Sequence, residues 1–266
     1  MNNIKISKWV GRFGNNLEQI ASCILLSKCI DGMTKIDIPI HNNYSKFLNT
    51  NTKFLFSKEY DYSVKKFDLI DWTTNCYYTP ALRYVDEEYK SLIVDKFLDI
   101  FRLHIKPLLL TDSKKNNFSK DTISIHLRGG DIINSNSLLY QQRNLKWDFC
   151  KNILENNNYT KVIVCRDDDS NPLYEKIIDY CKYEGIELDN VKRSMAEDFC
   201  ILMNSTNILS TGFSTFSFTS AYMNENLNNF YYALIPSNNQ AHKEKIRLKV
   251  LEKGQCNLKI LNNFYN

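Results

Sequence analysis

The segment Ile123-Ser-Ile-His-Leu-Arg-Gly-Gly-Asp131 decides the fold class. Its apolar start predicts a buried strand over 122–127, and its end carries His126, Arg128, two glycines and Asp131. Polar and charged groups that follow a buried strand lie at the carboxyl edge of a parallel sheet, where ligands bind in open α/β folds. The segment therefore predicts an α/β protein with a binding site directly after this strand.

The sequence after this segment alternates predicted strands with predicted helices. The strands are expected at 122–127, 161–165, 207–210 and 230–235, and the helices at 145–154, 172–184, 196–203 and 215–224. Ser194 and Glu197 have the spacing of a capping box that opens the third of these helices. Such alternation implies parallel βαβ units, so this half is predicted to be doubly wound.

The sequence before the segment is less regular. It predicts strands at 4–10 and 35–40, weaker strands near 53–56 and 67–70, and helices at 17–30 and 87–101. The polar stretch 111–121 reads as a linker between two domains, 1–115 and 116–266.

Composition limits the function classes. The 266 residues are 43% hydrophobic, enough for a folded core, and a net charge of +4 is too small for a nucleic-acid-binding surface. No apolar run approaches the roughly 18–20 residues that a transmembrane helix needs. Eight scattered cysteines without a C-x-x-C pair suit a reducing compartment. A soluble cytoplasmic protein is therefore expected, with a position at a membrane surface as the alternative.

Two segments suit a phosphate group. Arg128 offers a planar fork of donors, and Gly129 and Gly130 allow the backbone to approach a ligand closely. Ser214 and Thr215 lie where a predicted strand passes through a hydroxyl-rich loop into a helix, whose first amides attract anions. The alternatives are a strand-end salt bridge for the first segment and an ordinary helix cap for the second.

Two further segments leave more than one interpretation open. In Gly11-Arg-Phe-Gly-Asn-Asn16, Arg12 and Asn15 could face a ligand, whereas Asn16 could cap the next helix. In Cys165-Arg-Asp-Asp-Asp169, the carboxylates could bind Mg²⁺ or Mn²⁺, or Asp168 could accept hydrogen bonds from a base or ribose. No zinc-site spacing, nucleophile elbow or Walker A loop is present in the sequence.

Taken in order, these segments resemble the fucosyltransferases that share an H-x-R-R-x-D-type motif, especially the α-1,2-fucosyltransferases. The family's G-G/R-L-G-N-Q turn corresponds to residues 11–16, H-x-R-R-G-D to 126–131, and S-D-D to 166–168. Its E-D, L-M and N-S-S-F-S-W-W-A-A-W-L segments correspond to 197–203 and 210–223. The resemblance extends from residue 11 to about residue 224.

The resemblance implies a GT-B architecture, with two Rossmann-like domains that face a cleft. It implies an inverting transfer of fucose from GDP-fucose to a glycan hydroxyl without a required metal or other cofactor. Residues 1–115 would form the acceptor side and residues 116–266 the nucleotide-sugar side. The expected partners are thus a nucleotide sugar and a glycan acceptor.

The resemblance also assigns roles to individual residues. Arg128 would stabilise the charge of the departing diphosphate. Asp131 is one candidate for the base that deprotonates the acceptor, and Glu18 or a carboxylate in the aromatic region 41–80 is another. The expected nucleotide contacts are His126, Arg128, Gly130, Asp168, Ser214, Thr215 and Phe216, and the expected substrate contacts are Arg12 and Asn15.

Two positions depart from the family pattern. Gly129 stands where many members carry a second arginine, and Phe218-Thr219 replaces a Trp-Trp pair. These departures favour one alternative, a GT-B transferase that uses another nucleotide sugar. A second alternative, from a different class, is a non-catalytic protein that binds a sugar nucleotide.

Overall fold

The structure is a computed structural model that describes residues 1–6, 8–9, 11–50, 54–61, 87–110, 118–130, 133, 146–210, 214–233 and 241–261. For 87–90, 241–244 and 261 it describes the backbone alone. The chain forms two compact units, Met1–Asp112 and Ser113–Asn266. That these units face each other, and that they serve as acceptor side and nucleotide side, stay predictions.

The first unit contains a small mixed sheet. Strands β1 (Asn2–Lys5) and β2 (Met33–Asp37) are parallel, and β3 (Phe54–Ser57) pairs antiparallel with β2. Helix α1 (Phe13–Ser27) connects the parallel strands, and every one of its residues is buried. Helix α3 (Glu87–Ile100) packs against α1.

The second unit alternates strands and helices throughout. Its elements are β4 (Thr122–Leu127), α5 (Trp147–Asn156), β5 (Lys161–Arg166), α6 (Leu173–Glu184), β6 (Glu187–Asp189), α7 (Met195–Asn204), β7 (Asn207–Ser210), α8 (Thr215–Met223), β8 (Asn229–Ala233), α9 (Ala241–Lys253) and β9 (Asn257–Leu261). The sheet order is β6-β5-β4-β7-β8-β9, and all of these pairings are parallel. This is the doubly wound order of a Rossmann fold. The predicted α/β class is confirmed.

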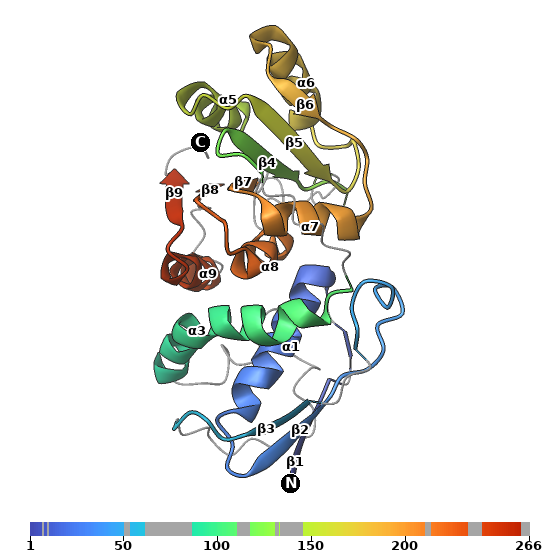
Figure 1. Cartoon of the computed structure of the whole chain (residues 1–266), viewed down its shortest axis with the longest axis vertical. Helices are drawn as coiled ribbons and strands as arrows, with labels where there is room; N and C mark the ends of the chain where they lie inside the picture. Colours follow the sequence, from blue (N-terminus) through green and yellow to red (C-terminus); the bar gives the residue numbers. More distant parts are fainter. Residues whose placement is uncertain are drawn as a thin grey trace. The chain divides into compact units, whose positions relative to one another are not determined.

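Helices cover both faces of this sheet. Figure 1 shows α5 and α6 on one face and α7, α8 and α9 on the other. All six residues of β4 are buried, as expected for a central parallel strand. No helix in the described part of either unit has the length and apolarity to cross a membrane.

Most predicted elements of the second unit are confirmed within two residues. The strands predicted at 122–127 and 207–210 have their observed bounds, and the capping box of Ser194 and Glu197 is present. In the first unit β1 lies nearer the N-terminus than predicted, and α1 begins at Phe13 rather than residue 17. The strand predicted near 67–70 lies outside the described residues.

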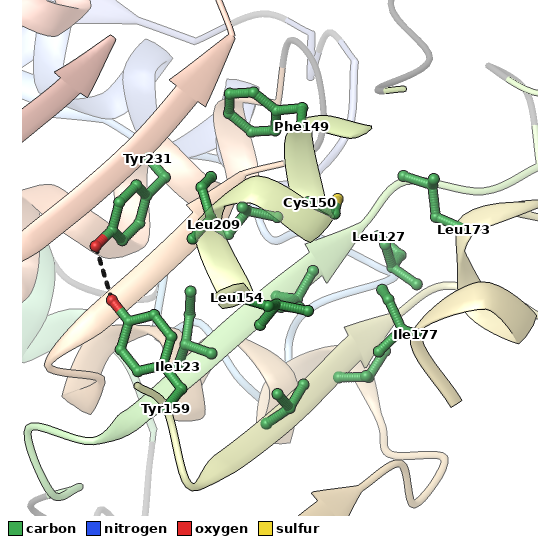
Figure 2. Packing of buried hydrophobic residues seen from close by; sticks show 14 of the residues in the cluster. Ile123, Leu127, Phe149, Cys150, Leu154, Tyr159, Leu173, Ile177, Leu209 and Tyr231 are labelled. Carbon is green, nitrogen blue, oxygen red and sulfur yellow. Dashed lines mark hydrogen bonds between the residues drawn. The ribbon is translucent and has the colours of Figure 1, made fainter. Parts of the chain in front are cut away.

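The apolar core under α5 and α6 contains a hydrogen-bonded pair of tyrosines. Figure 2 shows Phe149, Cys150 and Leu154 of α5 packed over the sheet, with Tyr159 and Tyr231 joined beside them. The two tyrosine hydroxyls lie 2.8 Å apart, and that of Tyr231 also donates to Oδ1 of Asn157 at 3.0 Å. Burial raises the pKa of both tyrosines, so both stay neutral donors.

The order of donation makes the two tyrosines unequal. Because Tyr231 donates to Asn157, Tyr159 must donate to Tyr231. Tyr159→Phe should therefore cost about 1 kcal/mol, the net value of one hydrogen bond. Tyr231→Phe should cost more, about 1–3 kcal/mol, since it leaves the buried Tyr159 hydroxyl without its acceptor. Urea midpoints at equal m-values would measure both, and equal costs would contradict this donor order.

Candidate functional site

The order of the parallel sheet reverses between β4 and β7. From β4 the chain continues outward through β5 to β6, and from β7 it continues in the opposite direction through β8 to β9. Ligands of open parallel sheets bind beyond the carboxyl ends of the strands at such a point. The two segments predicted to suit phosphate, after β4 and before α8, both lie here.

His126 joins the two segments. Its Nδ1 lies 2.7 Å from Oγ of Ser217 in α8, and its ring centroid lies 5.1 Å from that of Phe216. Only 2% of the residue is exposed. Burial, assisted by the charge of Arg128 and opposed by that of Asp167, lowers its pKa to about 4. His126 is therefore a neutral group that ties β4 to the start of α8.

Arg128 lies just beyond the end of β4. Its carbonyl oxygen accepts a hydrogen bond from Nδ2 of Asn171 at 2.8 Å, and Oδ1 of Asn171 accepts from the amide of Leu173 at the start of α6. Its Nη1 lies 4.0 Å from Oδ2 of Asp167, and 17% of the side chain is exposed. The backbone is thus fixed, while the side chain keeps partial access to solvent.

Asp168 belongs to the turn beside Arg128. Its Oδ1 accepts hydrogen bonds from the amide of Ser170, at 2.9 Å, and from the Ser170 hydroxyl. The same hydroxyl oxygen accepts from the amide of Gly130 at 3.0 Å. Gly130 adopts a φ of +55°, in the left-handed region that favours glycine. The structure therefore places Asp168, predicted as a nucleoside contact, against the glycine turn.

Ser214 precedes the first residue of α8 but does not cap it. Only 2% of Ser214 is exposed, its side chain makes no capping hydrogen bond, and within the described ranges its buried Oγ has no hydrogen-bond partner. Ser194, by contrast, bonds the Glu197 amide at the start of α7. The ordinary-cap alternative for Ser214 is therefore wrong. A buried hydroxyl at a helix N-terminus suits an anionic ligand.

Asp198, in the first turn of α7, was not predicted as a site residue. Its Oδ2 accepts from the amide of Arg166 at 3.1 Å, and its buried Oδ1 has no hydrogen-bond partner in the described part of the chain. Burial raises its pKa to about 6. One sequence signal could have indicated it. Glu197 already completes the capping box with Ser194, so the cap does not account for a second acid, Asp198, next to the apolar Phe199.

The three consecutive carboxylates after β5 have three different partners. Asp167 lies near Arg128, Asp168 accepts from Ser170, and Asp169 pairs with Nε of Arg166 at 2.6 Å. They do not converge on one point. In the described ranges, no three His, Cys, Asp or Glu side chains form a group that could hold a metal ion.

The predicted substrate contacts lie in the first unit. Arg12 is exposed and precedes the first residue of α1, whereas Asn15 is buried. Gly11 has a φ of +77°, and a Cβ there would meet the side-chain nitrogen Nδ2 of Asn15 at 2.0 Å. Asn16, the alternative cap, lies inside the helix, where its Oδ1 bonds Nε2 of His41 at 3.0 Å. The cap interpretation of Asn16 is therefore wrong.

The remaining site predictions are distributed as follows. Thr215 and Phe216 lie in the first turn of α8, and Phe216 packs against both His126 and Phe199. Asp131, the predicted base, lies outside the described residues.

Comparison with known proteins gives weak similarities. No protein-family model matches the chain, and no curated protein is significantly similar to it. Among solved structures it is similar to POFUT1 in complex with GDP-fucose, at 14% identity and a TM-score of 0.34 over 55% of this chain and 49% of that one. POFUT1 in complex with GDP gives 14% identity and a TM-score of 0.33, over 55% and 50%. The chain thus spans about half the length of these structures, and similarities of this size carry no argument about function.

Proposed function

We propose that this protein is an inverting glycosyltransferase that moves fucose from GDP-fucose to a glycan hydroxyl in an α-1,2 linkage. The observation that supports it most is the pair formed by Arg128 and the uncapped N-terminus of α8, at the reversal point of a Rossmann sheet. A planar guanidinium and a helix start with a buried hydroxyl suit a diphosphate. The sugar and the linkage rest on the ordered motifs of the sequence.

Asp198 supports guanine as the base. Guanine presents two adjacent N–H donors, at N1 and N2. Oδ1 of Asp198, a buried carboxylate oxygen without a hydrogen bond to any described residue, suits such an edge. Uracil has one N–H donor flanked by carbonyl oxygens, which a carboxylate would repel. The raised pKa of Asp198, about 6, still leaves it ionised at neutral pH.

The proposed chemistry uses the residues of this chain alone. Cleavage of the anomeric C–O bond places negative charge on the diphosphate, and Arg128 with the first amides of α8 would stabilise that charge. Asp131 would take the proton of the attacking hydroxyl. Neutral His126 would hold the two phosphate-binding segments in register. This assignment needs no metal.

Nucleotide-dependent thermal stabilisation tests the proposal. The protein should melt at a higher temperature with GDP, GDP-fucose or GDP-mannose, with or without EDTA, because a ligand that binds only the folded state stabilises it. At one hundred times Kd the gain is about 2.7 kcal/mol. A preference for UDP or UDP-sugars would overturn the donor and retain the transferase class. Guanine binding without turnover on a glycan panel would favour a non-catalytic binding protein.

A further inference from the structure

Position 129 has room for no side chain because a carboxylate occupies the space. A Cβ built on Gly129 would meet Oδ1 of Asp168 at 2.2 Å, Cγ at 2.7 Å and Oδ2 at 3.0 Å. Unlike Gly130, Gly129 has no left-handed φ. A left-handed conformation therefore does not require glycine here, and the nearest obstacle to a side chain is the carboxylate of Asp168.

Hydrogen bonds hold that carboxylate in place. Ser170 donates to it from both its amide and its hydroxyl, and the oxygen of that hydroxyl accepts from Gly130. The hydroxyl has a single hydrogen, so donation to Asp168 leaves its oxygen as the acceptor for Gly130. In both hydrogen bonds between Ser170 and Asp168, the carboxylate is therefore the acceptor.

The loop after β5 thus holds the turn after β4 at both ends. Asn171 bonds the carbonyl of Arg128, Ser170 bonds the amide of Gly130, and Asp168 packs against the residue between them. These contacts fix the backbone that carries the guanidinium. Rigid support of this kind determines how accurately a binding group is placed.

We propose that Asp168 is a positioning residue for Arg128 and that glycine at position 129 is required by it. Many of the fucosyltransferases that the sequence resembles carry an arginine at this position, and here the carboxylate fills the space that a side chain at position 129 would need. Gly129 is then explained by the position of Asp168. The proposal rests on the proposed function to the extent that Arg128 binds a diphosphate.

A double-mutant cycle tests this coupling. Gly129→Ala should displace the carboxylate and weaken GDP binding about tenfold. In the Asp168→Ala background the same substitution should have no further effect, because the obstructing group is gone. Asp168→Asn keeps the shape of the side chain, so Gly129→Ala should remain harmful beside it. Asp169→Ala provides the matched control. Asp169 is an acid of the same loop, but it pairs with Arg166.

Guanosine separates positioning from a general structural defect. Because guanosine lacks phosphates, Gly129→Ala should weaken GDP binding and leave guanosine binding unchanged. Equal losses for both ligands would overturn the positioning role. Failure of Asp168→Ala to relieve the effect of Gly129→Ala would overturn the coupling.

The ligand-free protein keeps the two proposals distinguishable. Gly129→Ala should lower the melting temperature when it is introduced into the wild-type protein. Introduced into the Asp168→Ala variant, the same substitution should leave the melting temperature unchanged. A wild type that binds no nucleotide would contradict the proposed function, and with it the role of Asp168 towards a diphosphate. The melting cycle would still decide whether Asp168 and Gly129 are coupled.

Discussion

Replacement of Arg128 by alanine is expected to lower the rate of sugar transfer about 10²- to 10³-fold and leave the fold intact. The expected loss follows from the role of Arg128 in the proposed site, where the guanidinium faces the charge that develops on the diphosphate. The side chain is partly exposed, and its Nη1 lies 4.0 Å from Oδ2 of Asp167, so its removal takes no fully buried group out of the core. Initial rates with saturating acceptor, together with circular dichroism, would measure both parts of the expectation.

Arg128→Lys is the matched control. Lysine keeps the positive charge but lacks the planar fork that binds two phosphate oxygens at once, so a rate between those of the alanine variant and the wild type is expected. A lysine variant as active as the wild type would show that charge alone suffices. A folded alanine variant with full activity would remove Arg128 from the catalytic machinery.

Replacement of Asp198 by asparagine is expected to weaken GDP binding about 10- to 100-fold, the value of hydrogen bonds to a charged acceptor. UDP binding should change far less, because the carboxylate favours the donor edge of guanine. Isothermal titration with the two nucleotides would give the ratio. Equal losses for GDP and UDP would contradict a contact between Asp198 and the base.

The pH dependence of GDP binding gives an independent check on Asp198. Its pKa is raised by burial to about 6, so the carboxylate becomes protonated as the pH falls through that value. GDP affinity should therefore decrease below about pH 6 in the wild type and stay flatter in Asp198→Asn.

Protein stability should respond to Asp198 in the opposite direction. A carboxyl whose pKa is higher in the folded state binds its proton more tightly there. Protonation therefore stabilises the ligand-free fold as the pH falls from about 6 towards the unfolded value of 3.8. Asp198→Asn should lose this contribution, which melting curves between pH 4 and 7 would show.

Local signals predict the elements of the second unit because those signals are confined to a few residues. The apolar run of β4 and the capping box at Ser194 each specify their element without reference to the rest of the chain. Strands β6 and β9 carry no such signal. They are edge strands whose pairing partners, β5 and β8, determine where they form.

The candidate site was only partly predictable, because local signals mark some of its residues and tertiary contacts determine the surroundings of the others. Arg128 and Ser214 follow from strand ends and a helix start, which the sequence marks. The surroundings of Asp168 and Asp198 depend on the pairing of β5 with β4 and on the packing of α7 at the end of β5. Those contacts join residues about 30 to 40 positions apart, and no local pattern encodes them.

The reversal of strand order also has a kinetic consequence. Strands β4 to β6 form one block of continuous sequence and β7 to β9 another, so each half-sheet can assemble before the two dock along β4 and β7. Arg128 belongs to the first block and Ser214 to the second. A ligand held by both would connect the halves only after docking. It would then slow unfolding and leave the folding rate unchanged, as do interactions absent from the transition state.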